Sequence, residues 1–152
     1  MAWADMPSIR IQLQSFDGTT PVEADFHRPA LYRDLFACLS QPGNFIARGA
    51  GLSYCNASAG AATQSVSTLT FNRVLAFDDE AGLVTVEPGI RLGTLLRLAV
   101  KRGWHMPVLP GHPAITVGGC VAFNVHGKSQ HSVGNFGDYI AGLKLFHPDH
   151  GE

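Results

Sequence analysis

Charge is scarce in this sequence, and so are cysteine and long apolar runs. Charged residues make up 15% of the 152 residues, hydrophobic residues make up 45%, and the formal net charge is −1. This balance is typical of a folded domain and excludes a disordered chain. It also leaves no excess positive charge for binding nucleic acid. The length suits one domain, within which small subdomains are possible.

The few cysteines and the lack of apolar runs limit where the protein works. Cys38, Cys55 and Cys120 are far apart, form no C-x-x-C pair and are odd in number, which predicts reduced thiols. Residues 1–10 lack the basic region and following apolar run that are typical of a signal peptide, and no stretch approaches the ~18 apolar residues of a membrane span. We therefore expect a cytoplasmic protein. The seven histidines are not combined with cysteines or carboxylates at ligand spacing, so we expect no metal.

Alternating apolar residues predict several strands. They occur over residues 8–16 and 45–47, and again at 68–71 and 74–77. The D-D-E-A-G turn then joins 74–77 to 83–86 as a hairpin. Strand-like runs also lie at 104–108, 120–124 and 140–146. The last of these leads into the turn P-D-H-G and lacks a returning partner, so we expect a chain cut short inside a larger protein.

Helical spacing predicts two helices. One opens at Pro29 and stops at Gly43, with one face formed by Leu31, Leu35, Cys38 and Leu39. The other ends at Gly103. Its core face is formed by Leu92, Leu95, Leu96, Ala99 and Val100. Strands and helices together predict an α+β fold.

Two glycine-rich loops are the candidate binding sites. The first, R-G-A-G-L-S-Y at 48–54, follows a predicted strand, and its glycines let successive amides form an anion-binding concavity. A nicotinamide-binding fingerprint would need a glycine in place of Tyr54 and an acidic residue about 20 positions later, and the sequence has neither. The second, P-G-H-P-A-I-T-V-G-G at 110–119, has adjacent glycines that suit a flat ring or a pyrophosphate. Thr116 and Asn124 are candidate hydrogen-bond partners, and G-N-F-G-D at 134–138 could close the same site.

The order of these segments resembles the FAD-binding domain of the vanillyl-alcohol oxidase and para-cresol methylhydroxylase (PCMH-type) family. The resemblance covers about residues 40–152, and it adds E-P-G at 87–89 and H-G-K-S-Q-H-S-V-G-N-F-G at 126–137 to the two loops. Within the family the chain is most similar to a flavoprotein subunit that oxidises a sugar. The resemblance implies two α+β subdomains, at about 8–78 and 79–152, truncated before the domain's end and without the substrate domain.

The resemblance also implies which residues bind FAD. In the first loop they are Gly49, Ala50, Gly51, Leu52, Ser53, Tyr54, Asn56 and Ala57. In the second region they are Pro110, Gly111, Thr116, Val117, Gly118, Gly119, Ala122, Asn124, Val125, His126 and Gly127. Many relatives carry at position 52 a histidine bonded to the flavin, whereas Leu52 has no nucleophile, so we expect non-covalent FAD.

A family member of this type oxidises a sugar or other alcohol at its hydroxyl-bearing carbon by hydride transfer to flavin N5. His126 and Lys128 are the catalytic candidates, beside the ring or the substrate. The implied partners are a small-molecule sugar or alcohol substrate and a reductase partner subunit. We expect the chain alone to be inactive, because catalysis needs a complete site. A non-catalytic nucleotide-binding module that uses the same loops is the alternative.

Overall fold

The structure, a computed structural model, describes residues 7–18 and 21–151. The chain divides into two compact units, Met1–Thr70 with Lys144–Glu152, and Phe71–Leu143. The division comes earlier than the subdomain boundary expected near residue 78, because the strand at 74–78 pairs with the strand that follows it. The chain also returns to the first unit at Lys144.

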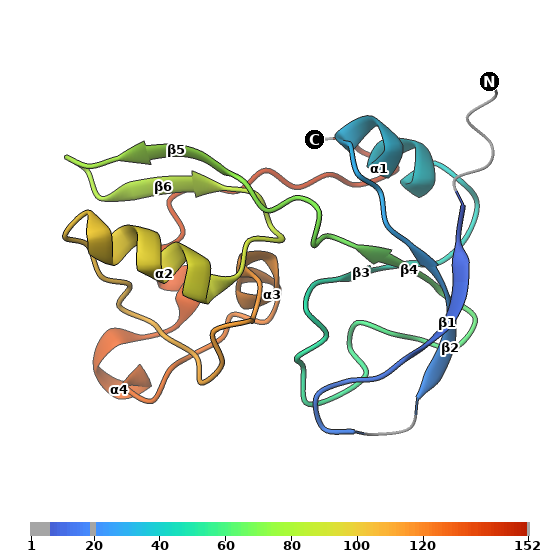
Figure 1. Ribbon diagram of the computed structural model, residues 1–152, viewed down its shortest axis with the longest axis horizontal. Helices are drawn as coiled ribbons and strands as arrows, with labels where there is room; N and C mark the ends of the chain where they lie inside the picture. The colour runs from blue at the N-terminus through green and yellow to red at the C-terminus, as the bar shows by residue number, and fades with distance from the viewer. Residues whose placement is uncertain (1–6, 19–20, 152) are drawn as a thin grey trace. The chain divides into compact units, whose positions relative to one another are not determined.

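The first unit contains a four-stranded sheet with one helix (Figure 1). Its elements are β1 (Ile9–Leu13), β2 (Val22–His27), α1 (Tyr32–Leu39), β3 (Phe45–Arg48) and β4 (Gln64–Ser67). The strand order is β1-β2-β4-β3; β1 runs antiparallel to β2, whereas β4 runs parallel to both β2 and β3. Leu13, Ala24 and Ala59 form its buried apolar cluster. The parallel pairing places the end of β3, where the first glycine loop starts, at the same sheet edge as the end of β4.

Sequence patterns located β1 and β3 but missed β2 and misplaced β4. The strand expected at 68–71 is wrong, because β4 lies just before it, at Gln64–Ser67. Its letters, Q-S-V-S, are mostly polar, yet Ser65 and Ser67 are buried, and Ser65 Oγ donates a hydrogen bond to the carbonyl of Ser58 (3.1 Å). The helix α1 begins at Tyr32 rather than at Pro29, which leaves Leu31 outside it and 47% exposed.

The second unit pairs a hairpin with helices. Its elements are β5 (Val74–Asp78), β6 (Leu83–Val86), α2 (Leu92–Lys101), α3 (Val117–Ala122), α4 (Gln130–Val133) and the 3-10 helix η1 (Phe136–Tyr139). Figure 1 shows the β5–β6 hairpin alongside α2. The buried core comes from α2, α3, η1 and the segments before and after α2: Ile90, Leu92, Leu95, Val108, Val117, Cys120 and Phe136. The predicted hairpin and the helix α2 are confirmed, although Val100 of the predicted core face is 55% exposed.

Three expected strands are absent from the described residues. The segment 104–108 has no ladder, although it buries Val108, and 120–124 lies mostly in α3. Residues 140–146 do not form a strand, because no segment among residues 7–18 and 21–151 pairs with them. A β-strand forms only where a neighbouring strand completes its backbone hydrogen bonds. The turn after it does form, since the amide of His147 donates to the carbonyl of Gly151 (2.8 Å). The α+β class is confirmed. Within the described part of the chain, every helix is too short or too polar to cross a lipid bilayer.

Candidate functional site

The first glycine loop follows β3, and the backbone amides of the loop donate no hydrogen bond to another backbone group among the described residues. The last bond of the parallel ladder runs from the amide of Thr68 to the carbonyl of Arg48 (2.9 Å). Beyond it, among the backbone hydrogen bonds of residues 7–18 and 21–151, no amide of 49–54 acts as donor. Residues 49–53 are half-buried and Tyr54 is exposed, and a run of accessible amides without a protein acceptor can form the donor set of an anion site.

The side chain of Arg48 lies against this loop. Its guanidinium donates to Ser58 Oγ (2.9 Å) and to the carbonyl of Gln14 (2.8 Å). Gly51 has φ +69°, and a Cβ there would collide with the guanidinium, whose Cζ would be 2.8 Å away. Glycine is therefore needed at position 51 both for its left-handed backbone and for the room that Arg48 takes. Burial lowers the pKa of the Arg48 guanidinium, which is still charged at neutral pH.

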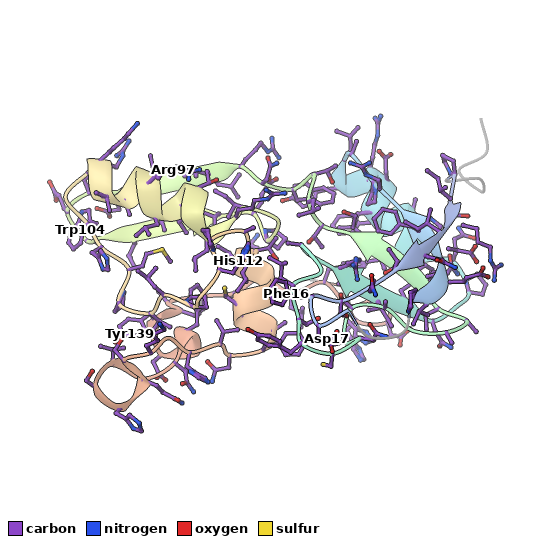
Figure 2. All side chains as sticks on the ribbon, turned by 60° about the horizontal axis from the view of Figure 1, so that its bottom comes forward. Phe16, Asp17, Arg97, Trp104, His112 and Tyr139 are labelled. Atoms are coloured by element: carbon purple, nitrogen blue, oxygen red, sulfur yellow. The ribbon has the colours of Figure 1, made fainter. Side chains whose placement is uncertain are left out.

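The far end of the loop is held by the turn that follows β1. Phe16, labelled in Figure 2, donates its amide hydrogen to the carbonyl of Ser53 (3.1 Å), and its ring meets the exposed ring of Tyr54 edge-on. Ser53 Oγ donates to the carbonyl of Cys55 (2.8 Å), and Asn56 Oδ1 accepts from Ser15 Oγ (2.8 Å). These two polar groups shape the loop internally, so backbone amides remain its main donors toward a ligand.

The second region folds around the short helix α3. Thr116 caps it, because its Oγ1 accepts from the amide of Gly119 (3.3 Å). The side chain of Thr116 is 2% exposed, and Val117 is 9% exposed. Both predicted contacts thus serve the helix and the core, with little side-chain surface left for a cofactor. Alanine at Gly111 would meet nothing within 4 Å, so the start of this region is open.

The E-P-G segment at 87–89 packs directly on α3. The amide of Gly118 donates to the carbonyl of Pro88 (2.8 Å), and a Cβ at Gly118 would lie 2.8 Å from Pro88 Cβ. Sequence reasoning noticed both segments but not this contact. It also missed the salt bridge between the buried Glu87 and Arg73 (2.8 Å), because the two residues are 14 positions apart and both lie just outside the hairpin strands, where no periodicity relates them.

The third stretch joins the second region, as the sequence suggested. Asn124, a non-glycine residue with φ +42°, accepts through Oδ1 from the amide of Gly137 (2.8 Å). The amide of Phe136 donates to the carbonyl of Val125 (2.8 Å). Ala122 lies exposed at the end of α3. A Cβ at Gly127 would lie 2.8 Å from the carbonyl oxygen of Leu109, so this glycine permits a close backbone approach.

The catalytic candidates lie on the surface of the second unit. His126 and Lys128 are exposed, and His126 Nδ1 lies 3.1 Å from the carbonyl oxygen of Gly127. In the same unit His112, labelled in Figure 2, accepts through Nδ1 from the amide of Ala114 (3.1 Å). No cluster of three or more histidine, cysteine or carboxylate residues with the makings of a metal site occurs in the part of the chain that the structure describes.

These donor sets fit a dinucleotide cofactor chemically. Unpaired amides at 49–54 beside the cation of Arg48 suit a diphosphate. Backbone exposed at Gly111 and in the exposed segment 122–124 suits a ligand that lies against bare peptide. The first loop belongs to one compact unit and the second region to the other.

Comparison with known proteins agrees with this chemistry. The family described as "FAD binding domain" matches residues 34–152. The decaprenylphosphoryl-beta-D-ribose oxidase of Mycolicibacterium smegmatis is 36% identical over 100 residues, which is 66% of this chain and 22% of that protein. A D-lactate dehydrogenase of Anaerostipes hadrus is 32% identical over 83 residues, which is 55% of this chain and 18% of that protein.

A solved structure shows the same fold. An alkyldihydroxyacetonephosphate synthase superposes with a TM-score of 0.66 at 21% identity, covering 80% of this chain and 26% of its own. The chain therefore spans about a quarter or less of the length of the proteins that it matches. The resemblance drawn from the sequence is confirmed: the chain belongs to the FAD-binding domain family of PCMH-type, FAD-linked oxidoreductases, and FAD is its cofactor.

Proposed function

We propose that this chain is the FAD-holding part of an oxidoreductase that oxidises a sugar or another alcohol at its hydroxyl-bearing carbon, with FAD held non-covalently. The observation that carries the proposal is the run of unpaired amides at 49–54 beside the guanidinium of Arg48. The names of two relatives support the substrate class, because a ribose and a lactate both carry a hydroxyl group on the carbon skeleton.

The two loops have different tasks in this proposal. The amides of 49–54 bind the diphosphate, and Gly51 lets the loop turn tightly over Arg48. Gly111, Gly119 and the segment 122–127 offer backbone for the remainder of the cofactor. Thr116, Val117 and Gly118 act indirectly, by capping α3 and by packing it on Pro88. Bound FAD supplies the hydride acceptor, its N5 atom.

His126 is the residue that we assign to the substrate hydroxyl. The contact of its Nδ1 with the carbonyl oxygen of Gly127 (3.1 Å) requires the ring proton on Nδ1. Nε2 is then the basic atom, which can accept the hydroxyl proton as the hydride leaves the carbon. Lys128 supplies a positive charge for a phosphate-bearing or otherwise anionic part of the substrate.

Other parts of the proposal concern the whole protein. Leu52 has no nucleophilic atom, which supports non-covalent FAD. The three free thiols support a cytoplasmic location, because such thiols persist in reducing compartments. A reductase partner subunit and a substrate domain would complete the enzyme, so we propose that the 152-residue chain binds FAD without turning over substrate.

Flavin binding by the purified chain tests the proposal. The wild-type chain, incubated with FAD and desalted, should keep a visible flavin spectrum, and acid precipitation should release all of the flavin into the supernatant. Gly51→Ala should bind poorly, because the new Cβ collides with Arg48. The matched control is Gly18→Ala, which has the same positive φ (+70°) but nothing within 4 Å of the added carbon.

Two outcomes would contradict the proposal, and a third would contradict the role given to Gly51. A folded chain that takes up no FAD would favour the nucleotide-binding module instead. Flavin that stays with the acid precipitate would overturn non-covalent binding. Equal loss of FAD in the Gly51→Ala and Gly18→Ala variants would show that backbone strain alone, and not the loop's contact with Arg48, controls binding.

A further inference from the structure

Arg48 is a cation held in place beside the first glycine loop. Its guanidinium is fixed by Ser58 Oγ at 2.9 Å and by the carbonyl of Gln14 at 2.8 Å, two acceptors from separate segments of the first unit. Its third neighbour is Gly51, whose missing side chain leaves room for the planar group. The side chain is half-buried. Arg48 therefore lies in one orientation against the loop whose amides are unpaired.

Arg48 forms no ion pair with a carboxylate in the described part of the chain. By contrast, Arg73 pairs with Glu87 and Arg102 pairs with Asp79. The oxygens of Ser58 and Gln14 that accept from Arg48 are all neutral. A partly buried charge is costly to leave uncompensated. An anion bound by the amides of the adjacent loop would compensate the charge of Arg48.

We propose that Arg48 is the positioning residue that makes the first loop selective for a diphosphate: its charge is balanced by the bound diphosphate, and its hydrogen bonds hold the loop's amides in place. The inference rests on the proposed function, and it deepens that function by naming the source of phosphate selectivity. Two effects then act together. The cation adds a salt-sensitive attraction, and the planar guanidinium bridges two acceptors, which a lysine ammonium cannot do in the same geometry.

Ligand titrations on four variants separate these effects. The variants are Arg48→Met, which removes the charge; Arg48→Lys, which keeps it; Ser58→Ala, which removes one acceptor; and Arg10→Met, a charge-loss control on an exposed arginine of β1. The ligands are FAD and inorganic pyrophosphate, which carry the diphosphate, and riboflavin, which does not. Each is titrated at low and at high sodium chloride, and circular dichroism confirms folding.

The inference predicts a defined pattern. Arg48→Met should weaken FAD and pyrophosphate binding by about tenfold or more, the size expected for one close charge. It should leave riboflavin binding unchanged and reduce the salt dependence of FAD binding. Arg48→Lys should keep that salt dependence while binding FAD less tightly than wild type. Ser58→Ala should lower the melting temperature but keep the preference for diphosphate, and Arg10→Met should match wild type.

Other results would overturn it. Wild-type affinity and salt dependence in Arg48→Met would show that the cation plays no part. Parallel loss of FAD and riboflavin would show a structural role only. If riboflavin binds too weakly to measure, the salt dependence of FAD binding by itself tests the inference. If Arg48→Met does not fold, Arg48→Lys provides the test, because a folded lysine variant whose FAD binding does not depend on salt contradicts the inference. A folded wild-type chain that binds neither FAD nor pyrophosphate would instead defeat the proposed function.

Discussion

Replacing Gly118 with alanine separates packing from cofactor binding in the T-V-G-G segment. Both glycines of this segment lie in the first turn of α3, and the sequence alone assigns them the same role. Their surroundings differ. A Cβ at Gly118 would lie 2.8 Å from Pro88 Cβ and 3.0 Å from the Pro88 carbonyl oxygen, whereas a Cβ at Gly119 would meet only Thr116 Oγ1, at 3.2 Å.

The magnitude follows from two opposing effects. Forcing a methyl group into a packed contact costs about 1–3 kcal/mol, and here the obstacle includes backbone, which cannot rotate away. Alanine regains up to ~1 kcal/mol of helix propensity over glycine. Gly118→Ala should therefore lose about 1–2 kcal/mol of unfolding free energy, or about 3–8 °C in Tm. Gly119→Ala should stay within about 0.5 kcal/mol of wild type, because propensity offsets a small shift of Thr116.

Urea denaturation followed by circular dichroism measures both variants, and FAD titration separates the second role. Gly119→Ala should weaken FAD binding with little change in stability, since the added methyl group would keep a flat ligand away from the bare backbone at this position. Gly118→Ala should mainly lower the free energy of unfolding. If Gly118→Ala proves as stable as Gly119→Ala, α3 is not packed on Pro88 as the structure shows, and the reasoning fails.

Three further predictions concern buried groups. Arg73→Met should destabilise the protein by about 2–3 kcal/mol in urea denaturation, because Glu87 is 1% exposed and loses its charged partner; an unchanged midpoint would contradict this. Burial raises the pKa of the Cys120 thiol to about 12 from an ordinary 9.0, so the folded state holds this proton more tightly than the unfolded state. Its contribution is complete below pH 9 and is lost as pH rises toward 12. Wild type should thus lose up to ~1.4 kcal/mol per pH unit relative to Cys120→Ala over that window. The exposed Cys55 should react with a thiol reagent in the native protein before Cys120 does; simultaneous reaction would contradict the burial.

Local sequence patterns were enough to predict the strands and helices that depend on interactions between residues close in the chain. The strands β1 and β3, the β5–β6 hairpin and the helix α2 follow from alternation, turn residues and helical spacing. The strand β4 was not predicted because its serines are polar but buried. Ser65 donates to a loop carbonyl, and Ser67 accepts from the amide of Leu69. The helix α3 was not predicted, because V-G-G is a poor helix former by itself. It forms where Thr116 caps it and Pro88 accepts from its first turn.

The sequence by itself determined the positions of the glycine loops, because close backbone approach to a phosphate depends on a few consecutive residues. The cofactor family followed from the resemblance of its ordered motifs to those of the PCMH-type family. Only the tertiary structure decided what each residue in those loops does. It places Arg48 against Gly51, Pro88 against Gly118 and Asn124 against Gly137. The last two contacts join segments far apart in the chain, and the first depends on acceptors supplied by Gln14 and Ser58. Such contacts depend on how the strands and helices pack, which no local period encodes.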